Sequence, residues 1–281
     1  MMSLLRKYEI WWFLGLIVVV NALFVSGIGF DILSQRLYPM GRFALLAGVL
    51  GGIVLLSRGW AGIADLLRPM LQWRRPLGWY LFAFLWNPAV CLLVLTGLYA
   101  LNRSAMPEFS LNFAIVTRPD VFRSVLIGSF IGEIVWISYA VRRLSTSFTP
   151  YVSALIVGAV WTAWWVPMVF YNIGVVPDLP IAALLFNQMG IAAMCTFVYM
   201  HTKSGLLVLC LQVTFNFTIL ALPITPAVGG FTTYWTFAVT YFIAALLLFV
   251  IFGPKPLFVA QPLSAQGIKA ITEVDGNRRS P

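Results

Sequence analysis

The chain has 281 residues, of which 61% are hydrophobic and only 10% are charged. A soluble domain is about half apolar and about a quarter charged, so this composition excludes an ordinary soluble protein. The net charge of +9 does not indicate a nucleic-acid partner, because the basic residues lie at the ends of apolar runs rather than on one continuous face. The composition therefore predicts an integral membrane protein.

Eight apolar segments are long enough, or nearly so, to cross a bilayer as helices, which takes about 20 residues each. The sequence thus predicts an all-α, polytopic membrane protein with about eight transmembrane helices. The second segment is short, and its glycines Gly48, Gly51 and Gly52 predict close packing against a neighbouring helix. The predicted segments cover residues 10–30, 42–57, 79–101, 121–141, 151–172, 181–200, 205–223 and 233–252.

These segments form one predicted helical membrane domain over residues 1–255. The polar tail at 256–281 is expected to be cytosolic and disordered. If both termini face the cytosol, 13 of the 18 lysines and arginines lie on the inner side. Cytosolic loops of membrane proteins carry an excess of basic residues, so this bias predicts cytosolic termini.

Residues 58–76, between the second and third segments, interleave apolar side chains such as Trp60 and Trp73 with arginines such as Arg68. One interpretation is an amphipathic helix that lies on the anionic inner leaflet, with its tryptophans at the depth of the headgroups. The other is a basic loop that only fixes the topology. The sequence supports the two interpretations equally.

Glu133 is the only acidic residue inside the long apolar runs. A carboxylate at membrane depth is costly, so it is a candidate functional group whose partner has to be found. The α-helical neighbours of Glu133 include Ser129 and Trp136 but no cation. Either a protonated Glu133 hydrogen-bonds a hydroxyl or amide on another helix, or it accepts protons and lines a polar cavity.

Tryptophans and amides mark two further segments. Trp161, Trp164 and Trp165 precede a proline, and the adjacent pair points about 100° apart on a helix, so one of the two faces the bundle. Gln212 and Asn216 are four residues apart and share a helical face, which aims both amides at one point. Such amides either join helices by hydrogen bonds or line a site.

Ligands for a metal are scarce. His201 is the only histidine, and its position at the end of an apolar run predicts an interfacial or loop residue. Cys91, Cys195 and Cys210 lie in three separate apolar segments, without the spacing of metal ligands, and are expected to be free thiols. These residues do not supply the ligand set of a zinc site, so we expect no metal and no other cofactor.

Three segments resemble, in order, the motifs of the CPBP family of intramembrane peptidases. This family includes CAAX prenyl endopeptidases, bacteriocin-processing proteins and Abi-type immunity proteins. Its motifs are commonly EEIGWRGYLLPRL, FGLWHLP and FHASFN, and the last follows a turn such as TGS. They are similar here to GEIVWISYAVRRL at 132–144, WTAWWVP at 161–167 and HTKSGLLVLCLQVTFN at 201–216. The resemblance covers about residues 79–216. It implies a core like that of the CAAX endopeptidases, with a conical cavity that opens to the membrane or to the inner side.

Carried over residue by residue, the resemblance implies that most catalytic positions are replaced. The family's first glutamate, its general base, falls on Gly132, and its second falls on Glu133. The two motif histidines fall on Trp165 and Gln212, whereas the asparagine that helps to stabilise an oxyanion is retained as Asn216. Peptide hydrolysis needs a base, an acid and donors to the oxyanion. We therefore expect little or no catalysis by the family mechanism.

The preferred functional prediction is a catalytically impaired, CPBP-like protein of the bacterial cytoplasmic membrane. Besides membrane lipids, its expected partner is a hydrophobic or lipidated peptide, or a transmembrane helix of another protein, bound in the former active-site cavity. The residues expected to line that cavity are Glu133, Trp161, Trp165, Gln212 and Asn216.

Three alternatives remain. In an active endopeptidase, Glu133 is the general base and Asn216 stabilises the oxyanion. In a proton-coupled carrier, Glu133 titrates within a gated cavity. In a structural subunit of a larger membrane complex, Gln212 and Asn216 only join helices.

Overall fold

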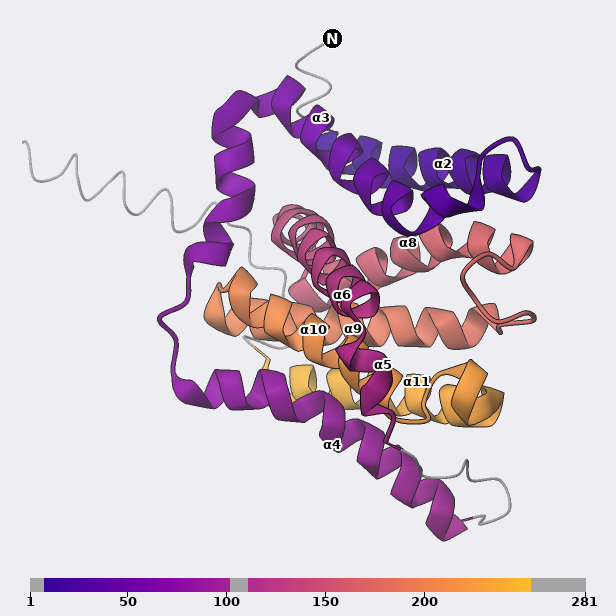
Figure 1. Ribbon diagram of the computed structural model, residues 1–281. Helices are drawn as coiled ribbons and strands as arrows, with labels where there is room; N and C mark the ends of the chain where they lie inside the picture. The colour runs from indigo at the N-terminus through magenta and orange to yellow at the C-terminus, as the bar shows by residue number, and fades with distance from the viewer. Residues whose placement is uncertain (1–7, 102–110, 254–281) are drawn as a thin grey trace, which may run out of the picture.

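The computed structural model describes residues 8–101 and 111–253, and within these ranges the regular structure is entirely helical (Figure 1). Seven helical stretches there are long and apolar enough to cross a membrane. The predicted all-α, polytopic membrane fold is therefore confirmed. The spans comprise α2 (Glu9–Gly29), α3 (Tyr38–Leu67) with its flanking turns η1 (Gln35–Leu37) and η2 (Arg68–Leu71), α4 (Leu77–Leu101), α6 (Pro119–Gly132) continued by η4 (Glu133–Val141) and α7 (Arg142–Leu144), α8 (Pro150–Tyr171), α9 (Ile181–Thr202) and α11 (Pro226–Phe252).

The seventh predicted segment forms α10 (Gly205–Ala221), an apolar helix of 17 residues that is shorter than the seven spans. A spanning helix has about 17 to 25 residues, so α10 is at the lower limit of that range. A further short helix, α5 (Phe113–Thr117), precedes α6.

Helix α9 lies at the centre of the bundle, between α8 and α11, and is the most buried of the spans (Figure 1). Gly158 on α8 lets the two backbones approach, because a Cβ atom there would lie 2.5 Å from the Cα atom of Met189. The close packing predicted for Gly48, Gly51 and Gly52 is wrong: an added Cβ at each meets none of the described residues within 4 Å. The close approach is instead made at Gly158 on α8.

The second span is longer than the predicted 42–57 and bends at Gly59, where φ is +65°. Beyond the bend the chain stays helical to Leu71 and exposes Trp60 and Leu71, which are 77% and 74% accessible (Figure 1). Both interpretations of residues 58–76 are compatible with this shape. The predicted tail at 256–281 lies outside the described residues.

The segment that contains Glu133 is not α-helical. Residues 133 to 141 form a π-helix, η4, inserted between α6 and α7. A π-helix pairs each residue with the one five positions on, so it turns the following side chains away from the faces that an α-helix would give them. This local change determines what surrounds Glu133.

Candidate functional site

A cavity of about 560 Å³ is lined by the first turns of α3, by α6 along its length from Asp120 to Gly132, by the C-terminal half of α8 and by parts of α9, α10 and α11. Four tryptophans contribute to its wall, and the polar groups there are mostly amides, hydroxyls and one arginine. A mainly apolar, concave site with a few polar groups is the usual form of a binding site for a small molecule or for part of a chain. The tryptophans are Trp136, Trp161, Trp164 and Trp165.

Four of the five predicted site residues meet at this cavity. Trp161 and Trp165 reach it from α8, and Gln212 and Asn216 reach it from α10. The nearest members of the two pairs, Trp165 and Gln212, are 47 positions apart in sequence, so tertiary packing brings the pairs together. The fifth residue, Glu133, is not among the residues of the wall.

The indoles form a packed cluster held by one amide. Trp136 stacks on Trp161, with ring centroids 5.5 Å apart and planes 19° apart. The amide orientation of Gln188 on α9 follows from its partners. With its oxygen towards the indoles, that oxygen accepts hydrogen bonds from Trp161 Nε1 at 3.2 Å and Trp165 Nε1 at 2.9 Å. The two tryptophans on motif positions are thus fixed in orientation by α9, and both lie in the cavity wall.

The amides of α10 are fixed by α6. Asn216 Nδ2 donates to Ser129 Oγ at 3.2 Å and to the backbone oxygen of Gln212 at 3.0 Å. The side-chain oxygen of Gln212 lies so close to Gly132 that an added Cβ there would be 3.1 Å away. Gly132 holds the position of the general base in the resemblance. Any side chain at that position would have to displace Gln212, so glycine and glutamine fit here as a pair.

Glu133 was expected to line the cavity but is not among its lining residues. Its carboxyl group is fully buried, and Oε1 accepts a hydrogen bond from Ser138 Oγ at 2.5 Å. The group points towards the start of α10, where an added Cβ on Gly205 would lie 2.8 Å from Oε1. Gly132, Trp136 and Gln212 line the cavity instead.

The cavity lies in the half of the bundle away from the chain ends. At the opposite end, Glu9 pairs with Arg143 and His201 Nε2 contacts the backbone oxygen of Phe252. The cavity instead includes Pro39, near the start of α3, and Thr225, just before α11. With the predicted cytosolic termini, this places it in the outer half, which does not agree with an opening to the inner side.

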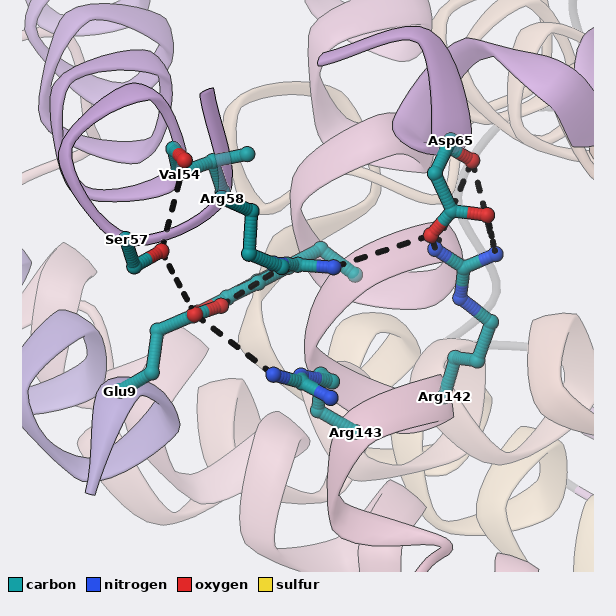
Figure 2. Close-up of polar contacts among 8 residues, drawn as sticks. Glu9, Val54, Ser57, Arg58, Asp65, Arg142 and Arg143 are labelled. Carbon is teal, nitrogen blue, oxygen red and sulfur yellow. Dashed lines mark hydrogen bonds and ion pairs between the residues drawn. The ribbon is translucent and has the colours of Figure 1, made fainter. Parts of the chain in front are cut away.

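A second polar cluster joins α2, α3 and the segment η4–α7 (Figure 2). Glu9 is 1% exposed, and its carboxylate accepts from Ser57 Oγ at 2.7 Å, Arg58 Nη2 at 2.8 Å and Tyr139 Oη at 2.9 Å. Arg143 adds an ion pair at 3.5 Å. Nearby, Asp65 pairs with Arg58 at 3.7 Å and with Arg142 at 2.5 Å (Figure 2).

Sequence reasoning missed Glu9 and Arg42. Glu9 directly precedes the first apolar run, and Arg42 begins the second, so both occupy positions where charges commonly flank a membrane helix. Arg42 is in fact 9% exposed and lies in the cavity wall. Charges at helix ends often reach the membrane surface, so position alone does not reveal that these two are buried.

In comparisons with known proteins, the chain matches no protein-family model and no curated protein. The resemblance to the CPBP motifs therefore stands on its three segments alone.

Proposed function

We propose that this protein is a non-catalytic binding protein of the bacterial cytoplasmic membrane, with cytosolic termini and a CPBP-like core. Its ligand is a hydrophobic or lipidated peptide, or a segment of a partner membrane protein, held in the tryptophan-lined cavity. The observation that carries the proposal is that Trp161, Trp165, Gln212 and Asn216 line one cavity, whereas Glu133 is not among its lining residues.

The shape and chemistry of the cavity support binding. A volume of about 560 Å³ is within the range of sites for small ligands, which favours a chain end or a few side chains over a whole helix. Indole rings give a large apolar contact area with little conformational entropy to lose. Fixed amides such as Asn216 add the directional polar contacts that orient a bound chain.

The surroundings of Glu133 argue against peptidase activity. A general base has to reach, directly or through one water molecule, the group whose proton it removes. Glu133 is fully buried, is hydrogen-bonded to Ser138 and is not among the residues that line the cavity. In addition, indole and amide replace the two imidazoles that the resemblance implies for catalysis.

Site-specific photocrosslinking tests the proposal. A benzophenone amino acid replaces Trp165 in the cavity wall, and the same group at Leu247, which is 51% exposed on α11, is the matched control. After irradiation of intact cells, mass spectrometry identifies the attached species. We expect peptide or protein adducts at position 165 at several times the yield at position 247. Equal yields would refute a binding cavity.

Cleavage assays test the absence of catalysis separately. The protein in proteoliposomes is incubated with the crosslinked peptide species and with prenylated CAAX peptides, beside the Glu133→Gln variant. We expect the peptides to remain intact with both proteins. Cleavage by the native protein that disappears in Glu133→Gln would establish the endopeptidase alternative.

A further inference from the structure

A buried arginine lies in the cavity wall without a carboxylate partner. Arg42, on the first turns of α3, is 9% exposed. Among the described residues, no carboxylate forms an ion pair with it. Within that part of the chain, the cavity wall includes one carboxylate, that of Asp120. It is exposed and pairs with Arg118 at 2.7 Å. A charge buried in a membrane protein normally marks a functional site, because leaving it unpaired is costly.

Aromatic rings surround the Arg42 guanidinium. Its central carbon lies 4.4 Å from the ring centroid of Trp165, 4.9 Å from that of Trp164, 4.7 Å from that of Phe43 and 5.2 Å from that of Tyr38. All four distances are within the roughly 6 Å over which ring faces stabilise a cation. These rings hold the guanidinium at the cavity, but they do not provide the oxygen acceptors that its N–H groups prefer.

Most of the hydrogen-bonding capacity of Arg42 is unused. Nη1 donates to Tyr38 Oη at 3.1 Å and contacts Met168 Sδ at 3.0 Å. Nε is buried without a partner among the described residues, and the hydrogen bonds within that part of the chain do not include Nη2. A guanidinium offers five N–H groups in a planar fork that matches a carboxylate. Donors thus remain for an acceptor that enters from the cavity.

We propose that the cavity binds an apolar molecule by its carboxylate, which Arg42 holds while the indoles contact the apolar part. This inference rests on the proposed function and names the class of its ligand. The free C-terminus of a hydrophobic peptide and a fatty acid share this chemistry. A small hydrated anion fits less well, because the largely aromatic wall would not replace its water shell.

Two matched ligand pairs test the inference on the full-length protein in nanodiscs, with empty nanodiscs subtracted. One pair is a hydrophobic tetrapeptide with a free C-terminus and the same peptide with a C-terminal amide. The other is a fatty acid and the alcohol of equal chain length. Equilibrium dialysis gives the Kd of each ligand. In at least one pair we expect the acid to bind about tenfold more tightly, as a charge-assisted hydrogen bond predicts, and that pair identifies the source of the carboxylate.

Variants assign the preference to Arg42. In Arg42→Gln, the acid and the neutral ligand of the pair should bind with about equal Kd values. Arg36→Gln should retain the tighter binding of the acid, since Arg36 is exposed and outside the cavity wall. If Arg42→Gln does not fold, Arg42→Lys keeps the charge but loses the planar fork, and we expect the preference for the acid to fall several-fold.

The outcomes separate the two proposals. Equal binding of acid and neutral ligands to the native protein would overturn the carboxylate inference but leave a binding cavity in place. A preference that survives in the folded Arg42 variant would overturn the role of Arg42. If none of the four ligands binds and position 165 gives no crosslinks, the proposed function fails, and the inference fails with it.

Discussion

The Ser138 hydroxyl donates a hydrogen bond to the Glu133 carboxyl group at 2.5 Å, although the two residues are five positions apart. In an α-helix, residues three and four positions apart share a face, and the fifth turns away. The π-helix η4 closes its turns between residues i and i+5, which brings Ser138 onto Glu133. The departure from α-helical geometry therefore provides a local partner for the only acidic residue deep in the fourth predicted segment.

Ser138→Ala should destabilise the protein, because it leaves the Glu133 oxygen buried without its donor. The expected loss is about 1 to 3 kcal/mol in the free energy of unfolding. Thermal unfolding in detergent measures the change as a lower midpoint. Ser147→Ala is the control, since Ser147 is exposed just after α7. A midpoint no lower for Ser138→Ala than for Ser147→Ala would contradict the structural role of this hydrogen bond.

The positions of most helices were predictable from the sequence, because charged and proline-rich segments bound each apolar run. The predicted segment 181–200 became α9 at Ile181–Thr202, and 205–223 became α10 at Gly205–Ala221. The π-helix was not predictable, because an almost uniformly apolar run has no periodic pattern that distinguishes a π-helix from an α-helix. The α-helical neighbours expected for Glu133 therefore did not include Ser138.

The candidate site was predicted in part. The spacing of Trp161, Trp165, Gln212 and Asn216 placed them on motif positions, and these four residues do share a cavity. Arg42 could not be predicted as part of that wall, because its burial depends on how α3 packs against α8, more than 100 positions later. Tertiary contacts over such distances have no local signal in one sequence.

Glu9→Gln should destabilise the protein strongly. The substitution removes the negative charge that Arg58 and Arg143 share, while Ser57 and Tyr139 lose part of a common acceptor. Breaking a buried ion pair costs about 3 to 5 kcal/mol, and partial exposure of both arginines places the expected loss near the lower value.

Chemical or thermal unfolding in detergent measures the effect of Glu9→Gln. The matched control is Asp31→Asn, which removes a negative charge from an exposed position just after α2. We expect a change of less than about 0.5 kcal/mol for the control, as for most surface substitutions. Similar stabilities of the two variants would show that the Glu9 cluster contributes little to the fold.

Gly158→Ala should separate α8 from α9 and weaken the cavity. The new methyl group would lie 2.5 Å from the Cα atom and 2.9 Å from the backbone nitrogen of Met189, so one helix has to move. Overpacking of this kind costs about 1 to 3 kcal/mol. Gly48→Ala is the control, because an added methyl group there meets none of the described residues within 4 Å.

Both glycine variants can be compared by thermal unfolding and by crosslinking yield at position 165. Gly158 precedes Trp161 by one helical turn, and Gln188, which holds Trp161 and Trp165, directly precedes Met189. We therefore expect Gly158→Ala to lower both the unfolding midpoint and the yield, and Gly48→Ala to change neither. Loss of stability with an unchanged yield would show that the cavity does not depend on the contact between α8 and α9.

The side of the membrane on which the cavity lies can be determined by cysteine labelling. Pro177 is exposed in the loop between α8 and α9, beside Val176 of the cavity wall, and Ser147 is exposed in the loop between α7 and α8. The charge bias predicts that the first loop is outside and the second is cytosolic.

In a Cys210→Ser background, a membrane-impermeant maleimide should label Pro177→Cys in intact cells and Ser147→Cys only after permeabilisation. Cys91 and Cys195 are buried and give little background. The reverse pattern would place the termini outside and the cavity in the cytosolic half, and the ligand would then have to enter from the cytosol.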